Sequence, residues 1–153
     1  MEREKTIEVL NTLITINDDR IEGYETAAQE TEAQDLKVLF AKFSSTSQKC
    51  KNDLVIEVTK LAGTPAEGTK TTGKFFRVWM DVKAALAGND RKAILNSCEY
   101  GEDVAKETYE EALNNDSENL STEQQTMIKA QHTLLAADHN KVKTMRDELV
   151  EAK

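Results

Sequence analysis

Carboxylate and imidazole side chains interrupt the otherwise apolar helical seams of this chain, and these groups could bind a metal. The candidate ligands are Glu102 and His139, with Asp138 and Glu99 close to them in the sequence. Carboxylate oxygens and imidazole nitrogens suit Fe, Mn or Zn. One interpretation of these residues is therefore a carboxylate/histidine metal site inside a helical bundle.

The ligand pattern of a di-metal carboxylate bundle is incomplete in this sequence. Such a site takes one Glu from each of two helices and a Glu-x-x-His pair from each of the other two. No Glu-x-x-His occurs here, because Ala136 stands three residues before His139 and Lys129 three residues before His132. Ser47 stands where the second helix would supply a ligand. A complete di-iron centre is disfavoured, and a degenerate or mononuclear site is the metal interpretation that stays open.

The same interruptions also fit a layer of buried hydrogen bonds without any metal. Asn17, Ser47 and Gln131 lie on the seams of three different helices, and Asn17 and Ser47 come at about the height of Glu102 and His139. Polar residues on a bundle seam can fix register and oligomeric state at some cost in stability. This interpretation needs no cofactor, and it is the one we favour from the sequence.

Four long amphipathic helices must position these residues. Apolar side chains recur at steps of three and four, which indicates helices with one buried face. We expect helices over about 4–30, 35–62, 90–113 and 121–150, and a shorter one over 75–87.

Capping signals support these boundaries. Gly63, followed by Pro65, predicts the end of the second helix at a glycine C-cap. Asn89 or Asp90 is expected to cap the third long helix. The stretch 121–124, Ser-Thr-Glu-Gln, has the form of a capping box for the last one.

Three residues inside the helices suggest contacts across the bundle. Gly23 and Gly101 interrupt helices, and an interior glycine costs helix stability. We expect a close approach by another backbone at Gly23 and a close helix contact at Gly101. Arg20 could pair with carboxylates across the bundle, but its position in a dense charged stretch favours a solvated face.

The connections define the expected topology. The turns near 31–34 and 114–119 are short, whereas the link between the second and third long helices is long and contains the short helix. A long middle link makes those two helices parallel, as in ferritin-like bundles with one crossover. We therefore predict an all-α, ferritin-like four-helix bundle with a short extra helix in the crossover, as a single domain over 1–153.

Composition excludes several classes of protein. The net charge is −8 and there is no Lys/Arg cluster, which argues against nucleic acid or an anionic membrane as partner. No apolar run approaches the roughly 20 residues of a membrane span, and no signal core follows the charged start, so we expect a cytoplasmic protein. Cys50 and Cys98 lie on apolar stripes and are expected to be buried structural thiols.

Several stretches, in this order, resemble a bacterial family of ferritin-like four-helix-bundle proteins of unknown function. The residues that carry the resemblance are Leu10-Asn11-x-Leu13-Ile14, Asn17-x-Asp19-x-x-x-Gly23-Tyr24-x-x-Ala27, Arg77-x-Trp79-x-Asp81-x-Lys83, Cys98-Glu99-x-Gly101-Glu102-Asp103 and Tyr109-x-x-Ala112-Leu113. The resemblance implies a distant relationship in fold to ferritins and rubrerythrins and no established activity. The metal ligands of ferritins cannot be assigned to this sequence from the resemblance. Only Glu102, on the third long helix, falls near the position of such a ligand.

Two functions are consistent with these observations. The first is a non-enzymatic bundle without a cofactor that acts through self-association, for example as a homodimer, or through a protein partner. The resemblance extends this interpretation to a role in stress physiology. The alternative is a metal-binding or di-metal oxidase-like protein with a degenerate site that holds Fe, Mn or Zn in the bundle core.

Overall fold

The computed structural model describes residues 3–67, 73–88 and 90–151, and the side chains of 73–78 and 150–151 are outside the description. Within these residues the chain is all-helical, as the sequence predicts. The elements are α1 (Arg3–Glu30), α2 (Gln34–Lys60), α3 (Gly73–Ala87), α4 (Arg91–Asn115), the 3-10 turn η1 (Ser117–Asn119) and α5 (Thr122–Glu151).

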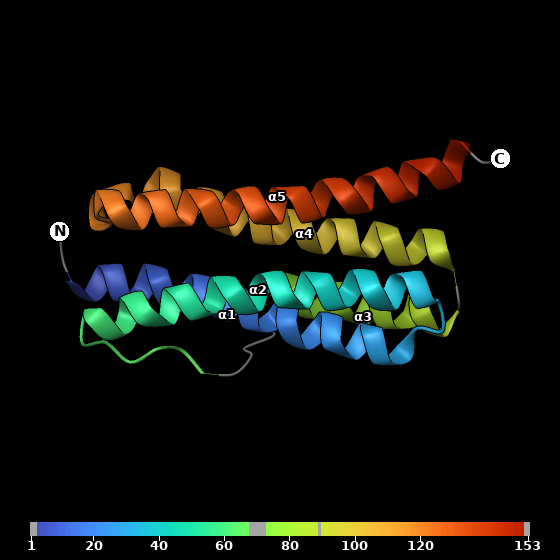
Figure 1. Ribbon diagram of the computed structural model, residues 1–153, viewed down its shortest axis with the longest axis horizontal. Coiled ribbons are helices and arrows are strands. Elements are labelled where there is room, and N and C mark those ends of the chain that lie inside the picture. Colours follow the sequence, from blue (N-terminus) through green and yellow to red (C-terminus); the bar gives the residue numbers. More distant parts are fainter. Residues whose placement is uncertain (1–2, 68–72, 89, 152–153) are drawn as a thin grey trace.

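The four long helices form two antiparallel hairpins that lie side by side (Figure 1). The first hairpin consists of α1 and α2, and the second consists of α4 and α5. Because the connection between them runs back along the bundle and includes α3, α2 and α4 point in the same direction (Figure 1). The expected parallel pair and the short helix in the crossover are therefore confirmed.

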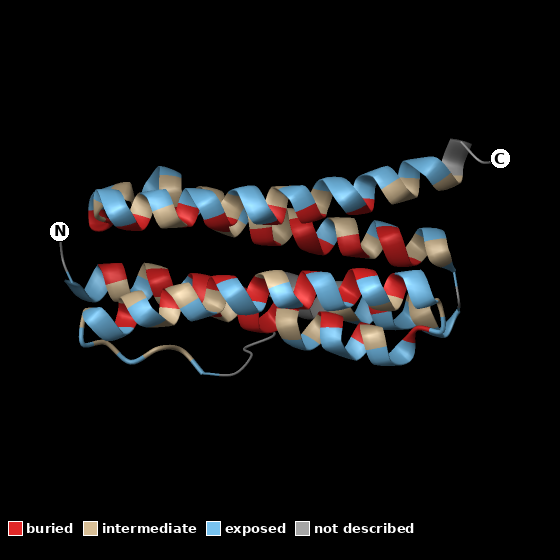
Figure 2. Ribbon diagram, viewed as in Figure 1, coloured by how far each residue is buried: buried red, intermediate tan, exposed pale blue. Residues whose placement is uncertain are grey.

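Two apolar clusters fill the interior between the hairpins. One, near the start of α1, is built around Leu10, Leu13 and Tyr109. The other, near the end of α1, is built around Tyr24 and Phe40. Buried positions recur along the inward faces of the helices (Figure 2), which is the arrangement that the three-and-four spacing predicts. The polar seam residues lie between the two clusters.

Side-chain capping fixes the start of two helices. Asp90 Oδ1 accepts a hydrogen bond from the Ala93 N–H at 3.1 Å at the beginning of α4, whereas Asn89 lies outside the described residues. At α5, Ser121 Oγ accepts from the Gln124 N–H at 3.0 Å, and Gln124 Oε1 accepts from the Ser121 N–H at 2.9 Å. This reciprocal pair confirms the predicted capping box.

The end of α2 differs in detail from the prediction. Ala62, not Gly63, adopts the left-handed conformation, with φ of 59°. The Gly63 N–H then donates to Val58 O at 3.0 Å and the Ala62 N–H to Thr59 O at 2.9 Å, which is a Schellman arrangement. Gly63 is needed for space instead, because a Cβ there would lie 2.8 Å from Ile7 Cδ1.

The close approach at Gly23 also has a different origin from the one expected. A Cβ on Gly23 would lie 2.0 Å from the Trp79 ring, so the neighbour is a side chain of α3 and not another backbone. Gly101 is buried in α4. No helix among the described residues is both long and apolar enough to cross a membrane.

Candidate functional site

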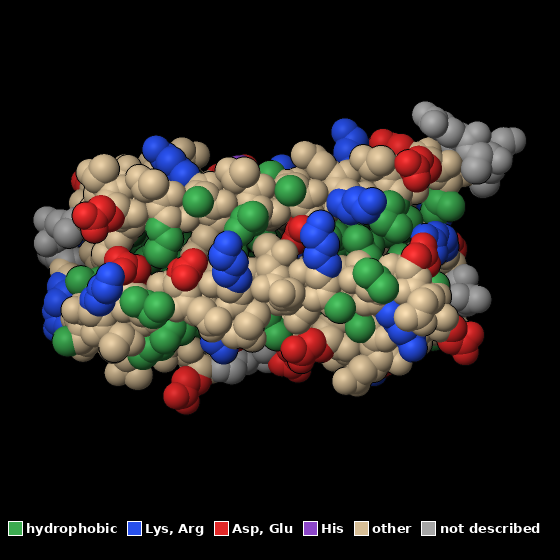
Figure 3. Space-filling view, in the orientation of Figure 1, with side chains coloured by type: hydrophobic (Ala, Val, Ile, Leu, Met, Phe, Trp, Pro, Cys, Tyr) green, Lys and Arg blue, Asp and Glu red, His purple; other side chains and the backbone are tan. Residues whose placement is uncertain are grey.

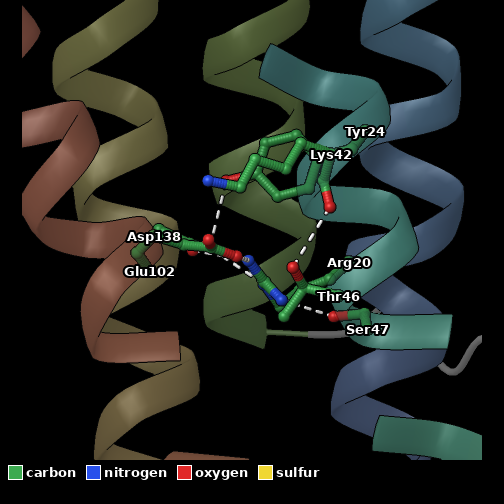
Figure 4. A network of polar contacts seen from close by, with 7 residues as sticks. All are labelled: Arg20, Tyr24, Lys42, Thr46, Ser47, Glu102 and Asp138. Carbon is green, nitrogen blue, oxygen red and sulfur yellow. Dashed lines mark hydrogen bonds and ion pairs between the residues drawn. The ribbon is translucent and has the colours of Figure 1, made fainter. Parts of the chain in front are cut away.

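Arg20 is the centre of the polar layer in the bundle core (Figure 4). Its side chain is 0% exposed. Its Nε donates to Glu102 Oε2 at 2.9 Å and its Nη2 to Glu102 Oε1 at 2.5 Å, which is a bidentate ion pair. Nη2 also donates to Asp138 Oδ2 at 3.2 Å, and Nη1 donates to Ser47 Oγ. One side chain of α1 thus binds α2, α4 and α5.

Tyr24, one helical turn after Arg20, closes this cluster on one side. Its hydroxyl donates to Glu102 Oε2 at 3.0 Å. The guanidinium carbon of Arg20 lies 5.4 Å from the centre of the Tyr24 ring, within the range of a cation–π contact. The ring in turn packs against Phe40, Phe43 and Trp79, with centroid distances of 5.6, 5.1 and 5.0 Å. The ionic cluster is therefore bounded by aromatic rings.

The electrostatics keep the arginine charged. Burial by itself lowers the pKa of Arg20, but the charge and hydrogen bonds of Glu102 together with Tyr24 and Asp138 outweigh it, and the pKa ends above its ordinary value. Burial raises the pKa of Asp138, and the positive charges of Arg20 and Lys42 oppose that rise. Lys42 extends from α2 toward Asp138 (Figure 4). The two carboxylates thus face cations from α1 and α2.

A second hydrogen-bond network crosses the bundle beside the first. Asn17 Nδ2 donates to the Tyr109 hydroxyl at 2.8 Å, and that hydroxyl donates to Gln131 Oε1 at 2.7 Å. Gln131 Nε2 then donates to the backbone oxygen of Cys50 at 3.2 Å. Asn17, Ser47 and Gln131 are all buried, so these three side chains take part in hydrogen bonds within the core.

The four candidate metal ligands are divided between two places. Glu102 and Asp138 face Arg20 in the core. His139 faces the other way, toward α4, where its Nε2 lies 2.7 Å from Asp103 Oδ1. Glu99 is near them and forms an ion pair with Arg146 of α5. The structure therefore does not assemble the four residues into one site.

The core layer does not fit the di-metal centre of ferritin-like proteins. The guanidinium of Arg20 already supplies the positive charge between Glu102 and Asp138. Ser47 occupies the α2 position of the layer, and its hydroxyl accepts from the same guanidinium. A metal between these carboxylates would have to displace a buried, bidentate arginine, so we derive no chemistry through a metal at this place.

Arg20 is the residue that the sequence interpretation placed wrongly. The sequence favoured a solvated face for Arg20, with the neighbouring Ile21 on the buried seam. In the structure Ile21 is only partly buried and Arg20 is buried. The signal was present in the spacing, because Arg20 stands three residues after Asn17 and four before Tyr24, which places all three on one face.

Comparison with protein families identifies the relationship of the chain. A family model described as a domain of unknown function, DUF2383, matches residues 5–115, more than two thirds of the 153 residues. The chain belongs to the DUF2383 family. The matched region spans α1 to α4 and includes Arg20, Tyr24, Ser47 and Glu102, whereas α5 lies beyond it. No curated protein sequence matches this DUF2383 chain significantly.

Proposed function

We propose that this DUF2383 protein is a ferritin-like bundle that acts without catalysis, by associating with a second copy of itself or with another protein. The order of two hairpins with one long crossover supports the ferritin-like relationship. The observation that carries the non-enzymatic role is the Arg20 cluster, because it occupies the core layer where a ferritin-like protein would hold its reactive centre.

The cluster offers no group for a reaction. All three guanidinium nitrogens of Arg20 donate hydrogen bonds, and Glu102 accepts from both Arg20 and Tyr24. Arg20 and Glu102 are 0% and 1% exposed, so a substrate has no approach to them in this conformation. Such a layer fixes the relative position of the helices, as buried polar groups do in other bundles.

The surface supports a role in association. Val38 and Ile56 of α2 are 64% and 53% exposed. They are 18 residues apart, which is five helical turns, so they lie on the same side of α2. Leu134 of α5 is also exposed. Figure 3 shows hydrophobic side chains gathered along the seam between α2 and α5. Charged side chains lie between these hydrophobic ones (Figure 3), and we take this face, with its exposed apolar residues, as the association surface.

The decisive experiment is sedimentation velocity across a range of protein concentrations. We expect the unmodified protein to form a dimer or larger assembly, and V38Q/I56Q to shift toward the monomer. Glutamine is a good helix former, so both substitutions keep α2 intact. Tyr100→Gln is the matched control, because Tyr100 is an equally exposed large side chain on α4.

The outcome separates the two forms of the proposal. Dissociation by V38Q/I56Q but not by Y100Q supports self-association through α2 and α5. A monomer at every concentration contradicts self-association, and a protein partner is then the form that remains. Dissociation by neither variant would place the contact elsewhere, and dissociation by both would show that the effect is not specific to the α2 surface.

A further inference from the structure

Three potential metal ligands meet at the outer seam between α4 and α5, away from the Arg20 cluster. Glu99 and Asp103 are four residues apart on α4 and share one face, and His139 faces them from the antiparallel α5. One ligand atom from each residue lies within 4.8 Å of the other two. In the described part of the chain, no other group of three such side chains comes this close.

We propose that Glu99, Asp103 and His139 form a mononuclear site for a divalent transition-metal ion of the Zn(II) or Fe(II) class. One imidazole nitrogen and two carboxylate oxygens match the ligand preference of these ions. Three protein ligands also leave a fourth position for water, as in catalytic zinc sites. The site is independent of the proposed association, since it uses none of the exposed residues of α2.

The geometry requires only a small adjustment. With bonds of about 2.0–2.2 Å, neighbouring ligands of a tetrahedral ion lie roughly 3.3–3.6 Å apart. The His139 Nε2 and Asp103 Oδ1 atoms are 2.7 Å apart, and no pair in the group exceeds 4.8 Å. Movements on the order of 1 Å would seat an ion. The side chains of His139 and Glu99 are only 12% and 18% exposed, so packing already holds two of the ligands.

Arg146 acts as a built-in competitor at this site. Its guanidinium pairs with Glu99 from α5, where it supplies the positive charge that a metal would bring. Metal binding to Glu99 must break that ion pair, which lowers the observed affinity. Removal of the arginine charge should therefore strengthen metal binding, whereas removal of a ligand should weaken it. A merely structural cluster would not produce these opposite changes.

The chain contains a matched control for the histidine. His132, also on α5, lies 2.8 Å from Glu110 of α4, in a pair of similar geometry to that of His139 and Asp103. Glu110 has no second carboxylate beside it within the distance that defines the three-ligand group among the described residues. The His132 pair therefore tests whether any surface histidine–carboxylate contact binds the ion.

The test is titration of the chelator-treated full chain with Zn(II) by calorimetry, with Co(II) absorption as a second readout. We expect one ion per chain. His139→Ala and Asp103→Asn should weaken binding at least about tenfold, the scale on which even outer-shell partners affect metal sites. Arg146→Ala should strengthen it, and His132→Ala should leave it unchanged. Arg91→Ala removes a positive charge from a distant pair with Asp35 and controls for net charge.

The result can overturn the inference in two ways. Absence of stoichiometric binding in both the unmodified chain and R146A would exclude the site. Equal weakening by H139A and H132A would show adventitious surface binding. Circular dichroism of each variant establishes that it is folded, and sedimentation of the same samples reports association separately, so failure here leaves the proposed function unaffected.

Discussion

Arg20 and Glu102 form a bidentate ion pair across the bundle core, although 82 residues separate them in the chain. The pair joins the first hairpin to the second at a point where apolar packing is interrupted. Burying two charges costs solvation, and the cost is offset only when every polar atom finds a partner. Asp138, Tyr24 and Ser47 provide those partners.

Replacement of Arg20 should destabilise the protein strongly. We expect Arg20→Met to lower the free energy of unfolding by about 3–5 kcal/mol, because Glu102 and Asp138 would remain buried without their cation. Urea denaturation followed by circular dichroism measures this change. Arg91→Ala, in the exposed pair with Asp35, should cost less than about 1 kcal/mol.

The triple variant R20M/E102Q/D138N completes the comparison. It removes the carboxylate charges together with the arginine, so it should recover part of the stability lost in R20M. A triple variant less stable than R20M would show that the uncompensated charges are not the cause of the loss.

Asp138 should make stability depend on pH in a defined direction. Burial raises the pKa of Asp138 above its ordinary value of 3.8. Between the ordinary and the raised pKa the folded protein binds this proton more tightly than the unfolded chain. The stabilisation from Asp138 is therefore fully present below pH 3.8 and is lost as pH rises through the folded-state pKa.

The measurement is the free energy of unfolding of the unmodified protein minus that of Asp138→Asn, from acid to neutral pH. We expect this difference to fall as the pH increases. Asp81→Asn, an exposed position on α3, serves as control. A difference that increases with pH in the Asp138 series would be incompatible with a raised pKa.

A side chain at position 23 should destabilise the protein, because it would clash with the Trp79 ring. Gly23→Ala forces the Trp79 ring away from a contact of 2.0 Å. We expect a loss of about 1–3 kcal/mol, even though alanine favours the helix by about 1 kcal/mol. Gly88→Ala is the control, since its nearest neighbour would lie at an ordinary 3.7 Å. Thermal unfolding of both variants tests the contrast, and equal effects would contradict it.

The two thiols should be inert in the folded protein. Cys50 and Cys98 are both free and buried. Burial raises the pKa of Cys50 to about 11 and that of Cys98 further. Since the thiolate is the reacting species, we expect labelling by a thiol reagent at pH 8 to be at least about 100-fold slower in native protein than in denaturant. Fast labelling of either native thiol would mean that the bundle opens readily.

Much of the architecture was predictable from local patterns. The three-and-four spacing identified the helices, and Ser121 with Gln124 marked the start of α5 correctly. The cap was assigned to Gly63, one residue too late, since Ala62 adopts the left-handed conformation and Gly63 lies against Ile7. Spacing alone does not contain that contact.

The site was harder to predict for a physical reason. Sequence reasoning places a charged residue such as Arg20 on the surface by default. Its burial is offset only by hydrogen-bond partners from α2, α4 and α5. Those partners are distant in sequence. Two residues that are consecutive in a helix also point in different directions, because they are about 100° apart around its axis. Asp138 therefore faces Arg20 in the core, whereas His139 faces Asp103.

The portion of the chain that matches the family ends at residue 115, yet Asp138 and Gln131 complete both polar networks from α5. A fragment confined to that portion would lack α5. Arg20 would then lose one of its two carboxylate partners, Asp138, and the faces that α5 covers would be exposed to water. The matched segment is thus shorter than the segment that must fold together, and residues 5–115 expressed alone should aggregate or dimerise by exchanging helices.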